Sequence, residues 1–242
     1  MNFFSFDPNP NLRFDMYTPM HLVMTLMFIG VMIVFFLIKD RVYNSKYEKH
    51  IRYSLAAFLL INEIALAVIE IGAGEIFLPF HLCSISFLLA IVLLITNNEK
   101  IFIFVFFTGI IGGIVSFAIP EFGNGGYDRY RFYQFIIAHS AIIYVPIYYL
   151  TNYKYKINFK RFINIAVITN ILGFSMLGVN AILRATKFYP EANYMFTMGP
   201  PPEVESIFGV FPWHLFVFEG VLLLSFYIIY YFGNRYSNKQ NS

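Results

Sequence analysis

The chain has 242 residues, of which 58% are hydrophobic and only 13% are charged. A soluble domain would carry about 25% charged residues, so the composition excludes an ordinary soluble protein. The formal net charge of +3 is too small to indicate a nucleic-acid partner, and the single cysteine excludes a disulfide within the chain.

The apolar segments are long and continuous, which indicates membrane-spanning helices of about 20 residues rather than a β-barrel. Seven segments qualify. The sequence therefore predicts an all-α polytopic membrane protein, a bundle of seven transmembrane helices that makes up a single integral membrane domain over residues 1–242. In chain order, the predicted spans are residues 19–38, 53–71, 79–96, 101–119, 132–150, 162–182 and 213–233.

Basic residues gather at one end of this predicted bundle. Twelve of the 17 Lys and Arg residues follow the first, third, fifth or seventh span: Lys39, Arg41, Lys46, Lys49, Arg52, Lys100, Lys154, Lys156, Lys160, Arg161, Arg235 and Lys239. The remaining five, on the other side, are Arg13, Arg129, Arg131, Arg184 and Lys187. The positive-inside rule places the larger set in the cytoplasm. It predicts a multi-pass protein of the cell (plasma) membrane with its N-terminus outside and its C-terminus cytoplasmic.

Polar side chains within the spans fall mostly in the predicted outer half. Glu63 and Glu70, for example, are seven residues apart and share one face of the second span. Intramembrane ionisable groups usually face a bundle interior or a wet cavity, so their common depth predicts one outward-facing polar pocket. Its substrate-binding or supporting residues would be His81, Glu63, Glu70, Arg131, Gln134, Asn180, Arg184, Asn193, His214 and Glu219. The alternative is that these groups form interhelical hydrogen bonds that fix the bundle.

Cys83 lies in the apolar run FLPFHLCSISFLL, residues 77–89. Pro79 suits the first turn of a helix, which puts Cys83 near a helix N-terminus, where the dipole favours a thiolate. On a helix, His81 would lie about 200° away from Cys83 and would be a poor base for it. His139, from the fifth span, has a comparable depth and can approach, so Cys83 and His139 are the candidate nucleophile and base. The alternatives are an inert buried cysteine and a core histidine.

The fourth span carries Gly109, Gly112 and Gly113 on a face of small residues. A G-x-x-x-G spacing of this kind predicts close packing against neighbouring helices and has little chemical content.

Several runs resemble the YwaF-type bacterial membrane proteins, a seven-span family, over nearly the whole chain: LPFHLCSISF, FFTGIIGGIVS, RFYQFIIAHSAII, NYMF and FPWHLFVFEG. That family is similar to a eukaryotic group of multipass lipid enzymes. The group includes an acyltransferase that uses a membrane cysteine and histidine on phospholipids, and hydrolases of fatty-acyl esters that use threonine and histidine. The resemblance implies Cys83 as the nucleophile and His139 as the base.

The sequence favours a membrane-embedded lipid acyltransferase or acyl hydrolase that acts on a membrane phospholipid or lysolipid without a cofactor. No nucleotide-binding fingerprint is present. The alternative is a transporter, or a protein that binds small molecules or protons without covalent catalysis, using Glu63, Glu70, His139 and Glu219. No metal site is predicted, because His21, His81, His139, His214 and Glu70 come from separate helices without ligand spacing. The last span contains no lysine for a Schiff base, which excludes a retinal-type receptor.

Overall fold

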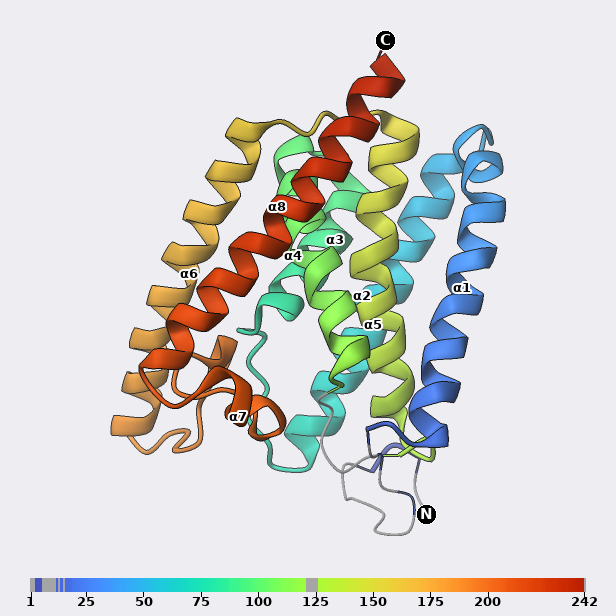
Figure 1. Cartoon of the computed structure of the whole chain (residues 1–242). Helices are drawn as coiled ribbons and strands as arrows, with labels where there is room; N and C mark the ends of the chain where they lie inside the picture. Colours follow the sequence, from blue (N-terminus) through green and yellow to red (C-terminus); the bar gives the residue numbers. More distant parts are fainter. Residues whose placement is uncertain (1–2, 6–11, 13, 15, 121–125, 242) are drawn as a thin grey trace.

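The computed structural model of the chain describes residues 3–5, 12, 14, 16–120 and 126–241, and Arg13 therefore lies outside the described residues. Every regular element in the described residues is helical (Figure 1). The long helices are α1 (Pro19–Tyr43), α2 (Glu48–Gly72), α3 (Leu82–Thr96), α4 (Glu99–Ala118), α5 (Tyr130–Tyr148), α6 (Phe159–Ala185) and α8 (Trp213–Asn241). The short ones are a π-helical turn η1 (Tyr149–Tyr153), the 3-10 turns η2 (Tyr194–Phe196) and η3 (Pro202–Val204), and α7 (Glu205–Phe208).

Six of the described helices are long and apolar enough to cross a membrane: α1, α2, α4, α5 with η1, α6 and α8. Their outer faces carry large exposed apolar side chains, such as Leu37, Ile61 and Phe174. Contiguous exposed apolar surface is unfavourable in water and natural against lipid. The prediction of a helical membrane protein with spans at these six places is confirmed.

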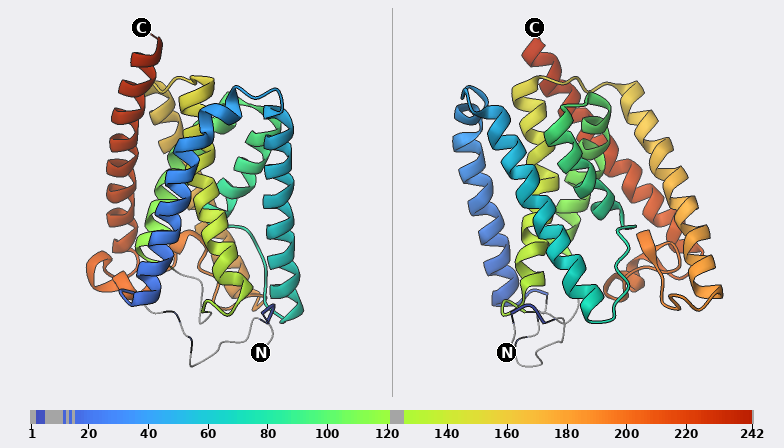
Figure 2. Two further views of the ribbon diagram at one scale, coloured as in Figure 1. Left: turned by 90° about the vertical axis from the view of Figure 1, so that its right-hand side faces the viewer. Right: turned by 180° about the vertical axis from the view of Figure 1, so that it is seen from behind.

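The third predicted span, residues 79–96, is shorter than expected. Helix α3 has 15 residues, about 22 Å of helix, against the 30 Å of a hydrocarbon core. Residues 75–81 before it are not helical. Pro79 disfavours the helical conformation at Leu78, and His81 is extended, with φ −70° and ψ 148°. The helix therefore begins at Leu82, part-way along its neighbours (Figure 2).

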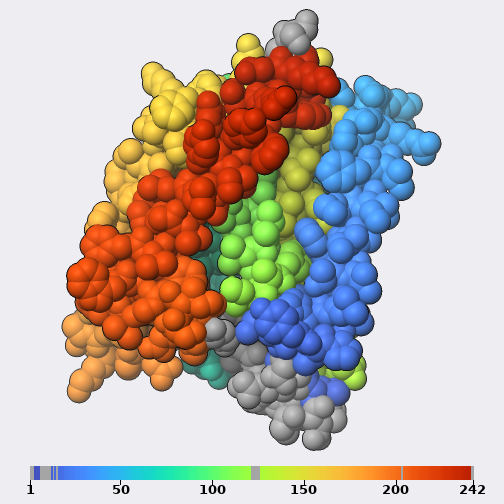
Figure 3. Space-filling model, in the orientation of Figure 1, coloured from blue at the N-terminus to red at the C-terminus, as the bar shows by residue number. Residues whose placement is uncertain are grey.

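Helix α4 lies at the centre of the bundle and packs against both α3 and α5. Helices α1 and α2 lie on one side of this group, and the α6–α8 pair lies on the other (Figures 1 and 2). Aromatic side chains of α4, including Phe102 and Phe107, are completely buried in the core. Seen from the front, the surface of the central helices is visible between α8 and α1 (Figure 3).

Two glycines of α4 permit its close approach to α5. A Cβ atom at Gly109 would lie 2.6 Å from the carbonyl oxygen of Ile142, and one at Gly113 would lie 2.9 Å from the carbonyl oxygen of His139. Both distances are shorter than a side chain tolerates against a backbone. The close packing predicted from the glycine spacing is confirmed, and its partner is α5.

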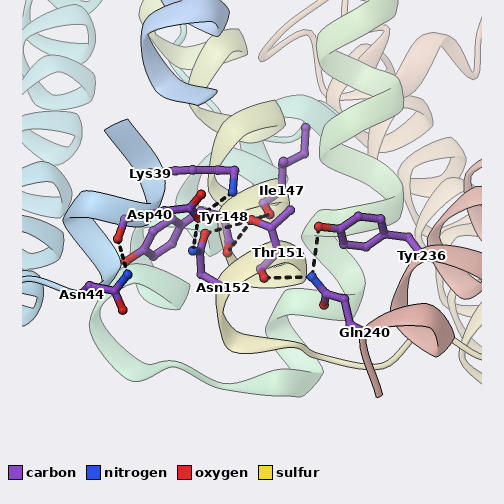
Figure 4. Close-up of polar contacts among 9 residues, drawn as sticks. All are labelled: Lys39, Asp40, Asn44, Ile147, Tyr148, Thr151, Asn152, Tyr236 and Gln240. Carbon is purple, nitrogen blue, oxygen red and sulfur yellow. Dashed lines mark hydrogen bonds and ion pairs between the residues drawn. The ribbon is translucent and has the colours of Figure 1, made fainter. Parts of the chain in front are cut away.

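The bundle has a basic end, which we define by the α1–α2 and α3–α4 connections, η1 with the α5–α6 connection, and the last turns of α8. There η1 joins α5 to several other helices. The Asn152 amide donates to Asp40 of α1 at 2.8 Å, and the Gln240 amide of α8 donates to the Thr151 carbonyl at 3.0 Å (Figure 4).

The tyrosines of the same turn reach two more helices. The Tyr149 hydroxyl donates to the Leu93 carbonyl of α3 at 2.9 Å and lies 2.6 Å from the side-chain oxygen of Asn97. The Tyr153 hydroxyl donates to Glu48 of α2 at 2.7 Å. One π-helical turn therefore holds α1, α2, α3 and α8 to the end of α5, and such turns are frequent at functional sites.

We expect Gly109→Ala to destabilise the protein by about 1–3 kcal/mol, because the new methyl group meets the rigid backbone of Ile142. Thermal unfolding of the detergent-solubilised protein measures this. The matched control is Gly173→Ala in α6, where a Cβ has no neighbour within 4 Å and alanine favours the helix. A Gly109→Ala melting temperature equal to that of the control would contradict the close α4–α5 packing.

The charge distribution gives an expected topology. In a Cys83→Ala background without cysteines, we expect a membrane-impermeant maleimide to label Glu191→Cys in intact cells and Lys46→Cys only after permeabilisation. Lys46 lies at the basic end, which the positive-inside rule places in the cytoplasm, and Glu191 lies in the connection between α6 and α8 at the other end. The opposite labelling pattern would reverse the orientation.

Candidate functional site

Cys83 is the second residue of α3, and His81 is its N-cap. The first backbone N–H groups of a helix have no partner within it, and the helix dipole favours negative charge at this end. The sulfur lies where negative charge formed during a reaction would be stabilised, nearer the helix start than the sequence indicated.

Helix α3 presents Cys83 to a glycine of α4. A Cβ at Gly112 would lie 3.7 Å from the Cβ of Cys83, so the absent side chain leaves room beside the cysteine. One turn further on, the buried hydroxyls of Ser86 and Thr108 are 2.8 Å apart and join α3 to α4. This contact fixes the rotation of α3 and the direction in which Cys83 points.

His139 is half-buried in the middle of α5. Its Nδ1 atom lies 2.8 Å from the carbonyl oxygen of Phe135, one turn earlier. A carbonyl only accepts hydrogen bonds, so Nδ1 carries the proton and Nε2 is left as the basic nitrogen. The Phe135 ring lies against the imidazole, with 4.1 Å between ring centroids. These contacts hold the histidine in one tautomer and one orientation.

Cys83 and His139 border adjacent residues of α4: the cysteine borders Gly112, and the histidine backbone borders Gly113. Helices α3 and α5 also contact each other directly. Arg131, at the start of α5, interacts electrostatically with both candidate side chains. The backbone of His139 and the side chain of Cys83 therefore both lie against the Gly112–Gly113 stretch of α4.

His81 does not share a helix with Cys83, since it precedes α3 in an extended conformation. The expected angle of about 200° between them therefore does not apply. Its ring packs against Tyr194 and Phe196, with centroids 5.3 and 5.4 Å away. His81 is positioned by the connection between α6 and α8, more than a hundred residues later in the chain.

Polar pairs join α2 to α5 beside this region. The Gln134 amide donates to the buried Glu63 carboxylate at 2.9 Å, and Arg131 lies 3.2 Å from the Glu70 carboxylate. Arg131 also interacts electrostatically with Glu63 and His81. Four of the predicted supporting residues therefore form two interhelical contacts next to the candidate pair.

Other predicted supporting residues hold the connection that covers His81. The buried Asn180 side chain accepts from the Tyr194 N–H at 3.0 Å and donates to the Tyr194 carbonyl at 2.9 Å. Arg184 donates to the Ala192 carbonyl at 2.6 Å. Burial raises the pKa of Tyr194 to about 12, so its hydroxyl is neutral at physiological pH.

Asn193 and His214 complete these contacts. Asn193 donates to the Gly199 carbonyl and accepts from the Met198 N–H, both at 2.9 Å. The fully buried His214 has its Nε2 atom 3.0 Å from the Phe196 carbonyl. In these contacts both residues form hydrogen bonds with the backbone of the chain itself. This agrees with the alternative that buried polar groups fix the bundle.

Glu219 belongs to another part of the molecule. Its carboxylate accepts from the Asn170 amide at 2.8 Å, between α8 and α6. The ring of His21 contacts the Phe117 carbonyl and the Tyr17 N–H. Within the residues that the structure describes, no three His, Cys, Asp or Glu side chains are arranged to hold a metal ion.

Two cavities, of about 500 and 400 Å³, lie away from the candidate pair. The larger lies between α4, α5 and α8, and the smaller lies mainly between α1, α2 and α5. Neither Cys83 nor His139 lines either of them. The sequence analysis also missed Ser86 and Thr108. The signal available for them was the presence of hydroxyl side chains within apolar runs.

The apolar outer faces and the helical bundle define a multipass helical membrane protein. The chain belongs to the TMEM164 family, whose family model matches residues 16–230. This range contains every candidate site residue. No curated protein and no solved structure matches the chain.

We expect Asn180→Ala to loosen the connection over His81. The change leaves the buried Tyr194 N–H without its partner, at a cost of about 1–3 kcal/mol. Hydrogen–deuterium exchange over residues 189–199 should then be faster than in wild type. The control is Ser175→Ala, an exposed residue of α6 that bonds to its own helix. Unchanged exchange in Asn180→Ala would show that other contacts hold this segment.

Proposed function

We propose that this protein is a membrane-embedded lipid acyltransferase or acyl hydrolase, with Cys83 as the nucleophile and His139 as the base. The observation that carries the proposal is the hydrogen bond from His139 Nδ1 to Phe135. It leaves Nε2 basic on a histidine whose backbone lies against Gly113 of α4, next to the Gly112 that borders Cys83. A cysteine activated by a neighbouring histidine is a common covalent catalyst.

The reaction proceeds in two halves. His139 Nε2 takes the thiol proton, and the Cys83 sulfur attacks the carbonyl carbon of an acyl ester in a phospholipid. The bond to the ester oxygen breaks, and the lysolipid leaves as an alcohol with the proton from His139. An acyl thioester remains. His139 then takes a proton from a lysolipid hydroxyl or from water, whose oxygen attacks the thioester and regenerates the thiol.

Arg131 is the proposed phosphate-binding residue. It is partly exposed, Glu70 orients it, and it interacts electrostatically with Cys83 and His139. A guanidinium near the reacting pair suits the phosphate of a lipid head group. His81 and Gln134 would shape the wall of the same site.

The packing at the basic end supports catalysis over transport. The core beyond Cys83 is filled by apolar side chains such as Leu93, Phe102 and Ile142, all nearly inaccessible to solvent. A proton or solute path would need polar groups through this layer. The proposed location is the plasma membrane, with the site opening toward the outer leaflet and the basic end in the cytoplasm.

The resemblance of the HLC, Q-F-I-I-A-H and N-Y-M runs to YwaF-type proteins, and their similarity to multipass lipid enzymes, supports the same assignment. It adds phospholipids and lysolipids as the substrate class.

Intact-protein mass spectrometry after incubation with mixed phospholipids tests the proposal. We expect wild type to gain the mass of an acyl group that hydroxylamine removes, and Cys83→Ala to gain none. His139→Ala should fail to load, because no base takes the thiol proton. The matched control is His50→Ala, an exposed histidine on α2, which should load like wild type.

Lipid products measured in parallel separate the two activities, since hydrolysis releases fatty acid and transfer forms a new phospholipid. An adduct that persists in Cys83→Ala would overturn the assignment. So would lipid turnover that is equal in wild type and Cys83→Ala.

A further inference from the structure

The larger cavity is a cleft at the basic end of the bundle. Its volume is about 500 Å³, and its walls come from three helices. The apolar wall consists of Phe106 and Ile110 of α4, Ile147 of α5, Leu150 of η1, and Ile229 and Phe232 of α8. Figure 3 shows the surface beside α8 on which this cleft lies. Because the cleft faces the lipid and its walls are apolar, a hydrocarbon chain is its natural occupant.

The cleft has a polar end formed by α8. Arg235 and Lys239 line it together with Tyr236, and the two cations, four residues apart, share one helix face. Arg235 is exposed and donates to the hydroxyl of Tyr231 at 3.1 Å. No ion pair to Arg235 is present among the described residues, so its charge is not neutralised there.

The apolar wall leads directly to the cations. From Ile229 to Arg235, α8 rises by about 9 Å, enough for the part of an acyl chain next to its head group. A chain lying along the apolar wall would therefore put its head group beside Arg235. A guanidinium binds phosphate oxygens in a bidentate manner.

The smaller cavity, between α1, α2 and α5, provides a comparison. It is also apolar, and its cations are Lys39 and Arg52. Each is paired with an acidic neighbour at short distance, Lys39 with Asp40 at 2.7 Å and Arg52 with Glu48 at 2.6 Å. The charges of the smaller cavity are compensated within the protein, whereas Arg235 of the larger cleft has no ion pair among the described residues, so complementarity to an anion at Arg235 distinguishes the larger cleft.

The polar end of the cleft is held firmly in place. Gln240 donates to the Tyr236 hydroxyl and to the Thr151 carbonyl, both at 3.0 Å (Figure 4). A Cβ at Gly233 would lie 2.8 Å from the Phe106 ring, so α8 crosses α4 at close range there. The two cations are thereby presented from a fixed helix.

We propose that the cleft between α4, α5 and α8 binds a phospholipid with an anionic head group, the acyl chain on the apolar wall and the phosphate at Arg235 and Lys239. This site is separate from the proposed reaction at Cys83. Its position at the basic end matches the leaflet in which anionic lipids attract basic residues.

Native mass spectrometry of the full-length protein in detergent tests the proposal. The probes are phosphatidylglycerol and phosphatidylcholine with identical acyl chains, added in equal amounts. We expect wild type to retain phosphatidylglycerol preferentially. The double variant Arg235→Gln, Lys239→Gln should lose about tenfold of this preference, as expected when charged hydrogen bonds are removed.

The matched control is Lys46→Gln, Lys49→Gln, which removes two exposed cations from the same end of the bundle, outside the cleft. It should keep the wild-type preference. A second variant, Ile229→Trp, fills the apolar wall and should reduce retention of both lipids without changing the cations. Thermal unfolding in detergent checks that each variant is folded.

Three results would overturn the proposal. The Arg235, Lys239 double variant could keep the wild-type preference. The Lys46, Lys49 variant could lose as much of it, which would mean general charge attraction. Glycerol phosphate, a head group without chains, could displace phosphatidylglycerol, which would mean a site for free anions rather than for a lipid.

Discussion

The close approach of α4 to its neighbours is the constraint on which the rest of the structure depends. Without side chains at Gly109 and Gly113, the α4 backbone approaches the carbonyl groups of α5, and Gly112 leaves room beside Cys83. In a membrane, helices associate through such close packing because lipid is as apolar as the side chains. The same three positions therefore build the core and set how α3 at Cys83 and the α5 backbone at His139 lie against α4.

The late start of α3 is the second feature that shapes the surroundings of Cys83, because it leaves non-helical backbone inside the bundle. Non-helical backbone within a membrane-embedded bundle is tolerated only where protein covers it or where it lines a cavity. Here the Tyr194 and Phe196 rings cover His81, and Asn180 anchors that covering segment to α6. Thus the polar residues of α6 and its following connection support the start of α3 from a distance.

Six spans could be predicted from the sequence, because each is a continuous apolar run whose length alone matches a membrane. The start of α3 could not, since it depends on Pro79 and on packing against a segment far along the chain. Hydrogen-bond pairs between helices, such as Glu63 with Gln134, could not be predicted from the sequence either. Helices that are apolar on most faces give little sign of how they are rotated, and rotation decides which polar groups meet.

The candidate pair itself followed from residue type and depth, whereas its surroundings did not. The residues of the run YLTNY do not indicate a π-helical turn. Its partners Asp40, Glu48, Leu93 and Gln240 come from four other helices and meet it only in the folded chain. The consequence is mechanical. Hydrogen bonds from this one turn hold four helices together at the basic end of the bundle. The basic end is therefore the part of the bundle where a separation of the helices would break the most interhelical contacts from a single turn.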